Sequence, residues 1–163
     1  MNYFGLEIEL RNKLYREAKS AAIAEFVCNN YPVYWSRLLD RKVDFIAQIG
    51  DEYFEIQVVK LKMKSNIFYT PKSSIVEPKK NRWIYLFLFP DTNEIPYFFF
   101  IHSVFLSNTN PVFKSIDNKN WCINFSPENI DLLKERCNVQ QFWNMCRTKQ
   151  MFHESKEHNK ECI

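Results

Sequence analysis

Three polar side chains near the middle of the chain have the types and spacing that metal-assisted chemistry needs. Asp44 lies in one alternating run of residues, and Glu55 and Gln57 lie in the next, with Gly50 and Asp51 between them. Glycine followed by a polar residue between two such runs predicts a hairpin, because glycine can supply the positive φ of a type II′ turn. A two-residue turn places Asp44 opposite Gln57 and one diagonal step from Glu55. The oxygens of the two carboxylates are then close enough to share a divalent cation.

The same register sorts the two predicted strands, residues 43–49 and 52–59, into an apolar and a polar face. The apolar face holds Val43, Phe45, Ala47, Ile49, Phe54, Ile56 and Val58. The polar face holds Asp44, Gln48, Tyr53, Glu55 and Gln57, with Ile46 as the exception. A half-exposed hairpin whose polar face is simply wet gives the same pattern, so the pattern alone leaves both interpretations open.

A basic stretch follows the hairpin. Residues 60–82 carry seven basic residues and one acid, although the whole chain has a net charge of only +3. Such a stretch can contact phosphates, and a solvated loop is the other interpretation. Phe68 and Tyr69 are available there to stack or to pack. The candidate nucleic-acid-binding residues are Lys62, Lys64, Lys72, Lys79, Lys80 and Arg82.

The composition and the cysteine pattern exclude several classes of protein and of functional site. Two glycines in 163 residues argue against a glycine-rich phosphate loop. Five widely spaced cysteines without a C-x-x-C pair predict reduced thiols, hence an intracellular, cytoplasmic protein, and no apolar run is long enough to span a membrane. His102 lies in an apolar run, where a hydrogen-bonded structural histidine is expected rather than a general base.

The elements that must position these residues follow from periodicity. We expect a helix over residues 4–29, broken at most once, then the hairpin, a loop over 64–82, two central strands at 83–89 and 97–105, and a short strand at 121–125. Ser126-Pro127-Glu128 predicts a helix start, and a second helix is expected from Gln140. The prediction is a single α/β or α+β domain over residues 1–152 with a polar, frayed tail at 153–163.

Three segments together resemble the PD-(D/E)xK nuclease superfamily, most closely its small homing-endonuclease and Holliday-junction-resolvase-like members. They are the helix with Arg16-Glu17-Ala18 up to Asn30-Tyr31-Pro32-Val33, then Val43-Asp44-Phe45, then Glu55-Ile56-Gln57-Val58-Val59-Lys60. The resemblance implies a restriction-endonuclease-like core, in which an N-terminal helix, a hairpin, two central strands in a mixed sheet and C-terminal helices position the site. It also implies a metal-dependent endonuclease that hydrolyses phosphodiester bonds of DNA with Mg²⁺, or Mn²⁺ as a substitute.

Carried over residue by residue, the resemblance implies that Asp44 and Glu55 bind the metal and that the helix contributes Glu17. Gln57 occupies the position of the usual lysine, and it cannot supply a positive charge. A bulge at Val58-Val59 would turn Lys60 onto the Asp44 face instead. An equally good alignment puts Gln57 at the acid position and Lys60 at the lysine position, and the sequence does not choose between the two.

Two alternatives to an active enzyme stand beside this hypothesis. The chain could be an inactive nuclease-fold module that binds nucleic acid or a protein partner, with Gln57 marking a lost site, or an unrelated α+β interaction domain. Metal dependence distinguishes an active nuclease from the inactive module. A salt-sensitive affinity for DNA distinguishes both of these from the unrelated interaction domain. A nuclease this small reaches two DNA strands by pairing with itself, so we expect a homodimer or a higher oligomer.

Overall fold

The computed structural model describes residues 3–35, 42–91, 95–107 and 110–161, with side chains over residues 9–154 of those ranges. Its helices are α1 (Tyr3–Cys28), α2 (Pro127–Arg136) and α3 (Val139–Glu161), with short 3₁₀ turns at Lys72–Ser74 and Ser103–Leu106. Its strands are β1 (Val33–Trp35), β2 (Phe45–Ile49), β3 (Glu52–Met63), β4 (Ile67–Pro71), β5 (Arg82–Pro90), β6 (Tyr97–His102), β7 (Phe113–Ser115) and β8 (Asn120–Asn124). The chain is therefore α+β, as predicted.

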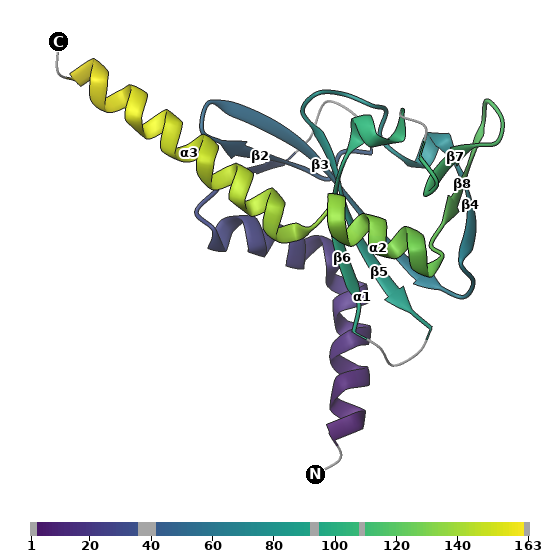
Figure 1. The fold of residues 1–163 in the computed structure, drawn as a ribbon. Helices are drawn as coiled ribbons and strands as arrows, with labels where there is room; N and C mark the ends of the chain where they lie inside the picture. The colour runs from purple at the N-terminus through teal and green to yellow at the C-terminus, as the bar shows by residue number, and fades with distance from the viewer. Residues whose placement is uncertain (1–2, 36–41, 92–94, 108–109, 162–163) are drawn as a thin grey trace.

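The first helix, α1, is bent where Glu17 leaves helical backbone geometry (φ −103°, ψ 16°), and Figure 1 shows the two halves pointing in different directions. The sequence allowed for one such break. The helix ends at Cys28, and Asn30 two residues later has a φ of +63°, the left-handed conformation that asparagine tolerates. The Tyr31 N–H then donates to the Phe26 carbonyl (3.0 Å), which satisfies a carbonyl of the last turn.

The main sheet has five strands in the order β1-β2-β3-β5-β6. Only β3 and β5 run parallel, so the sheet is mixed, as predicted. The hairpin register is also confirmed, because Ile46 pairs with Glu55 and Ile49 with Glu52. Gly50 has a φ of +61°, as the predicted turn requires, and its N–H donates to Oε1 of Gln150 on α3 (3.1 Å).

Two strand predictions need correction. The run 97–105 is not a central strand: β6 ends at His102 and lies at the edge of the sheet, where the backbone of Asn138 bridges to Phe99 and covers that edge. The predicted loop 64–82 contains β4, which joins β8 and β7 in a second, three-stranded sheet.

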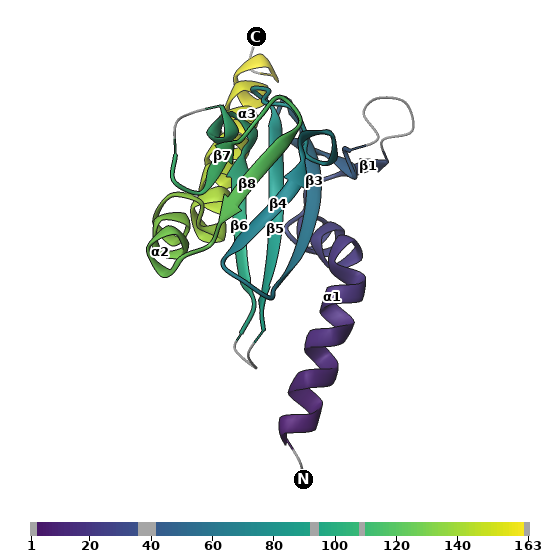
Figure 2. The same ribbon diagram turned by 90° about the vertical axis from the view of Figure 1, so that its right-hand side faces the viewer.

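Each face of the main sheet is buried by a different set of elements. Helices α1 and α3 cover one face, here the α1 side, where Phe26, Phe45 and Phe100 form the core. The second sheet and α2 cover the other, here the β4 side, and Figure 2 shows β4 and β8 crossing in front of the main strands. The predicted apolar hairpin face is therefore the α1 side, except that Val43 packs on the β4 side.

The C-terminal helices begin where the sequence predicted. Ser126 precedes α2, with Pro127 at its first position, and α3 starts at Val139. The tail predicted from residue 153 is instead helical as far as Glu161, and α3 projects beyond the sheets in Figure 1. Among the described helices, none is apolar enough over a sufficient length to cross a bilayer.

Candidate functional site

Asp44 lies just before β2, and its side chain bonds to the backbone of β3. Its Oδ2 accepts a hydrogen bond from the Val58 N–H (2.7 Å), and its Oδ1 lies 3.0 Å from Nζ of Lys19 on α1. Because β2 begins only at Phe45, strand alternation does not fix the direction of the Asp44 side chain, and its ion pair with α1 places it on the α1 side. About a quarter of this side chain remains exposed (26%), and Lys19 is half-exposed (47%).

Glu55 lies on the opposite side of the same sheet. Its Oε1 is 3.1 Å from Nζ of Lys79, and its Oε2 accepts a hydrogen bond from Nε of Arg82, the residue directly opposite on β5. Burial pushes the pKa of the Glu55 carboxyl up, but the hydrogen bonds and charges of Arg82 and Lys79 outweigh it and hold that pKa below its ordinary value. Glu55 is thus a buried, fully paired carboxylate.

Gln57 holds the segment that follows β4 against the sheet. Its Nε2 donates to the Ser74 carbonyl (2.8 Å), and its Oε1 accepts from the Val76 N–H (3.0 Å). The side chain is buried (7% exposed), and both ends of its amide are used by backbone groups. A charged lysine at this position could not make both of these bonds, because lysine only donates.

The two predicted metal ligands therefore have separate partners on separate sides of the sheet. A cation held by both carboxylates would require the Lys19, Lys79 and Arg82 contacts to break and the side chains to move. Within the described residues, no three His, Cys, Asp or Glu side chains gather in a cluster that could hold a metal ion. The shared metal site of Asp44 and Glu55 stays a prediction.

Lys60 lies on the α1 side without the predicted bulge. The pairing of β3 with β5 is unbroken from Glu55 to Met63, so side chains alternate regularly and Lys60 follows Ile56 and Val58 on that side. Its Nζ lies 4.8 Å from the centre of the Tyr15 ring on α1, and Nζ of Lys62 lies 4.5 Å from the same ring.

A second lysine–aromatic contact lies on α1, one turn further along the helix. Lys19 Nζ, which is paired with Asp44, also lies 5.8 Å from the ring centre of Trp35 on β1, a side chain that is 65% exposed. Tyr15, Lys19, Trp35, Lys60 and Lys62 together are here named the lysine–aromatic face. Glu17 is exposed at the bend of α1, between Tyr15 and Lys19 in the sequence.

The structure does not gather the predicted nucleic-acid-binding residues on one surface. Only Lys62 belongs to the lysine–aromatic face, while Lys72 donates to the Ser115 hydroxyl and lies over Trp121 on the second sheet. Lys79 and Arg82 are committed to Glu55. Lys64 and Lys80 are exposed.

Sequence reasoning missed Tyr15, Lys19 and Trp35. The spacing of four between Tyr15 and Lys19 puts them on one side of a helix, which is a detectable pattern. Their meeting with β1 and β3 depends on tertiary packing that a pattern does not contain. The expectation for His102 is confirmed: its Nδ1 accepts from the Val104 N–H (3.3 Å) and its Nε2 lies 2.8 Å from the Lys80 carbonyl, so the ring is held by backbone.

Comparisons with known proteins add little. No family model and no curated protein matches the chain. Among solved structures, the chain is similar to a Holliday junction resolvase, Hjc from Archaeoglobus fulgidus, with 16% identity and a TM-score of 0.40 over 64% of this chain and 86% of that one. A likeness at that level does not establish a shared family, so the resemblance to PD-(D/E)xK nucleases stays a prediction.

Proposed function

We propose that the chain binds DNA through the lysine–aromatic face. The observation that supports this most directly is the pair of lysines, Lys60 and Lys62, that project from one strand over a single tyrosine ring. Neither lysine forms an ion pair with a carboxylate among the described side chains, whereas Lys79 and Arg82 do. Lysines without a carboxylate partner keep their charge available for phosphates.

The aromatic residues of this face also favour DNA binding. Trp35 is 65% exposed beside Lys19, and a large exposed ring on a basic face suits a base that stacks while Lys60 and Lys62 contact the backbone. Lysine contacts to phosphates carry no sequence information, so we expect affinity without strong sequence preference from this face alone.

Fluorescence anisotropy with a labelled duplex and a labelled single strand tests the proposal. We expect Lys60→Gln/Lys62→Gln to weaken binding of both DNAs at least tenfold, and Trp35→Ala to weaken the single strand more than the duplex. The matched control is Lys114→Gln/Lys119→Gln, which removes the same charge from exposed lysines beside the second sheet. Equal affinity of wild type and both double variants, or loss only in the control, would overturn the proposal.

A second candidate function is metal-dependent hydrolysis of the bound phosphodiester, favoured by the position of Asp44. This carboxylate lies partly exposed on the same side of the sheet as Lys60, and its ion pair with half-exposed Lys19 is one that a divalent cation can displace. Mg²⁺ in proteins is commonly held by one or two carboxylates, water and substrate phosphates, so Asp44 alone can be a sufficient protein ligand, and the exposed Glu17 of α1 is the second carboxylate that we propose. Glu55 does not fit that set as it is placed, because its side chain is nearly buried and the positive charges of Arg82 and Lys79 already neutralise it.

The bound metal would supply a polarised phosphate and a water of lowered pKa. From the chain, Lys60 and Lys62 would hold the phosphate backbone, and Lys19, once displaced from Asp44, would be available to phosphate charge as well. Calorimetric titration of Mn²⁺ into wild type, Asp44→Asn and Glu55→Gln separates the two ligand sets. Binding lost only in Asp44→Asn supports this candidate, and binding lost in both supports the shared site. No binding to wild type, either free or in complex with a duplex, removes hydrolysis from consideration.

The expected homodimer is part of the proposal and needs its own measurement. Sedimentation velocity of the free protein and of its complex with a duplex distinguishes a constitutive dimer from one that forms on DNA. A monomer in both samples would contradict it.

A further inference from the structure

A cavity of about 470 Å³ lies between α1 and β5, and none of its lining residues belongs to the lysine–aromatic face. Leu14, Ala21 and Glu25 line it from α1, and Tyr85 and Phe87 line it from β5. The ends of α2 and β6 add Lys134, Tyr97 and Phe98. Its volume and its mostly apolar, aromatic lining with a few polar groups match the usual character of a small-molecule site.

The carboxylate of Glu25 is the acidic group in this lining. Its Oε2 accepts from the Tyr85 hydroxyl (2.5 Å), and its Oε1 accepts from the Trp143 Nε1–H (3.0 Å), so both oxygens are fixed in position. Among the described side chains, no lysine or arginine forms an ion pair with it. An ionised carboxylate only accepts hydrogen bonds, so a ligand that faces Glu25 has to present donors, and two adjacent donors match its two oxygens best.

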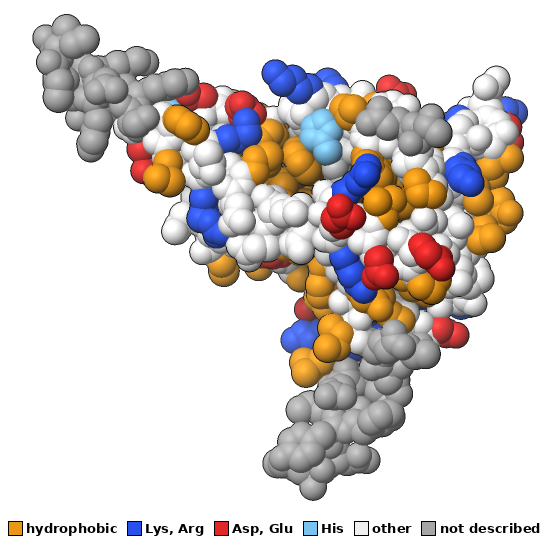
Figure 3. All heavy atoms as spheres, in the orientation of Figure 1, with side chains coloured by type: hydrophobic (Ala, Val, Ile, Leu, Met, Phe, Trp, Pro, Cys, Tyr) orange, Lys and Arg blue, Asp and Glu red, His pale blue; other side chains and the backbone are white. Residues whose placement is uncertain are grey.

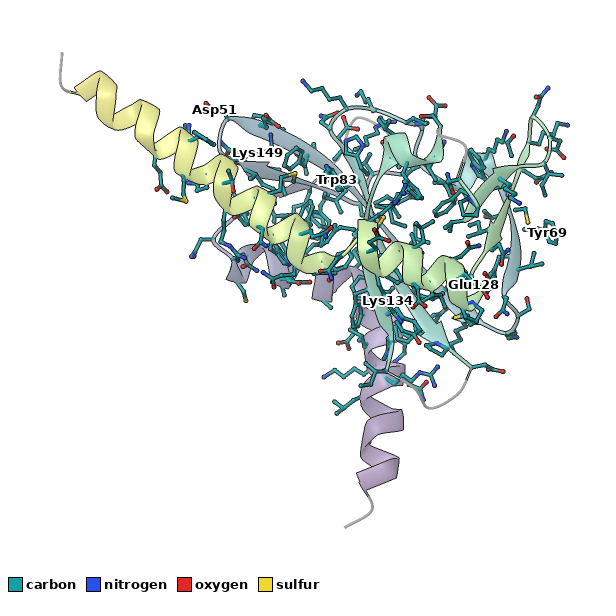
Figure 4. All side chains as sticks on the ribbon, in the orientation of Figure 1. Asp51, Tyr69, Trp83, Glu128, Lys134 and Lys149 are labelled. Carbon is teal, nitrogen blue, oxygen red and sulfur yellow. The ribbon has the colours of Figure 1, made fainter. Side chains whose placement is uncertain are left out.

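The opposite charge lies at the end of α2. Lys134 Nζ is 5.3 Å from the ring centre of Tyr97 and 3.0 Å from Oδ1 of Asp131, and half of its side chain is exposed. Figure 4 labels Lys134 where α2 passes in front of β5 and β6, and Figure 3 shows acidic and basic side chains over α2 with apolar ones exposed beside them. A ligand in the cavity would meet a carboxylate within and an ammonium at the rim.

We propose that this cavity binds a guanine base. The Watson–Crick edge of guanine presents two adjacent N–H donors that match the remaining lone pairs of the two Glu25 oxygens, and its flat ring suits the walls formed by Phe87, Phe98 and Tyr97. The exposed ion pair of Lys134 with Asp131 is weak enough to open and let Lys134 contact an attached phosphate. Adenine lacks that pair of donors. The base can belong to a free guanosine nucleotide or to an unpaired position in a DNA strand, because both present the same edge. The site goes beyond the proposed DNA-binding face and does not depend on it.

Titration calorimetry with guanosine 5′-monophosphate and adenosine 5′-monophosphate tests the proposal. We expect the guanosine nucleotide to bind wild type at least tenfold more tightly, and Glu25→Gln to remove that preference, because an amide replaces one acceptor by a donor. Glu9→Gln, on the exposed part of the same helix, is the matched control and is expected to bind like wild type.

A second pair of variants keeps the test independent of the fold around Glu25. Ala21→Leu fills the cavity and is expected to abolish nucleotide binding, whereas Ala24→Leu, which is exposed on α1, leaves it unchanged. A thymine oligonucleotide with one guanine is then added as a competitor. Displacement of the nucleotide shows that the cavity also accepts a guanine within a strand. Binding of either that depends on Glu25 and Ala21 supports the site.

Three results overturn it. They are no heat with either guanine form, equal affinity for the guanosine and adenosine nucleotides, and displacement of the nucleotide by arginine methyl ester at lower concentration, which would identify a guanidinium site instead. The DNA-binding proposal is tested separately. If that proposal is wrong, Lys60→Gln/Lys62→Gln leaves duplex affinity unchanged, and this result does not depend on whether the cavity binds the nucleotide.

Discussion

Glu55 and Arg82 face each other across the parallel pair of β3 and β5, and the Arg82 guanidinium donates to the Glu55 carboxylate in a region where both side chains are nearly buried, 9% and 11% exposed. Lys79, in the loop before β5, is the second cation paired with Glu55, and its side chain is half-exposed. This relationship makes Glu55 a structural anchor of the main sheet. A buried pair that loses one partner leaves an uncompensated charge, which is far more costly than losing a surface pair.

We therefore predict that Glu55→Gln lowers the free energy of unfolding by about 3 kcal/mol at neutral pH, because the nearly buried Arg82 and its neighbour Lys79 both lose the negative charge with which they pair. Urea unfolding measures the effect. The control is Glu52→Gln, which breaks the exposed pair with Lys149 and is expected to cost under about 1 kcal/mol. Similar costs for the two variants would contradict a structural role for Glu55.

The same anchor predicts a pH dependence. The pKa of Glu55 is lowered by folding, so its stabilisation is complete above the ordinary carboxyl pKa and is lost as the pH falls through the lowered value. The stability difference between wild type and Glu55→Gln should accordingly shrink in acid. A difference that stays constant from neutral pH to the acid limit of folding would show that the carboxylate is not the source.

Gln57 gives a prediction that separates structure from catalysis. Gln57→Leu removes both partners of the Ser74–Val76 backbone, so we expect a loss of about 1–3 kcal/mol in the free energy of unfolding. DNA affinity should be unchanged, since the side chain lies on the β4 side and the lysine–aromatic face lies on the α1 side. A variant of wild-type stability with impaired DNA binding or cleavage would instead assign Gln57 to the site.

The thiols should react in a defined order. Burial raises the pKa of Cys137 and Cys146 to about 12, whereas Cys28 is exposed at the end of α1. Iodoacetamide labelling followed by peptide mass spectrometry should modify Cys28 within minutes and leave Cys137 and Cys146 protected until the protein is unfolded. Early labelling of either buried cysteine would contradict the packing of α2 and α3 on the sheet.

Much of the main sheet could be predicted because its signals are local. Gly50 and Asp51 set the turn, the turn sets the register, and the register pairs Ile46 with Glu55. The continuous apolar run of β5 correctly predicts a strand buried on both faces.

The site was harder to predict because it depends on distant segments. The β4 side is covered by residues 67–76 and 113–125, so the burial of Glu55 and Gln57 cannot be seen in the hairpin itself. Strand β4 is short and begins beside lysine and serine residues, which favour a loop assignment. Asp44 lies one residue before β2, where alternation no longer determines which side a side chain takes.

The measurement that tests the central claim most directly is the salt dependence of duplex binding by wild type and Lys60→Gln/Lys62→Gln. If both lysines neutralise phosphates, the slope of log affinity against log salt concentration should fall by about 2 in the double variant, with a parallel loss of affinity at low salt. A double variant with the slope and affinity of wild type would contradict the assignment of the lysine–aromatic face as the DNA-binding surface.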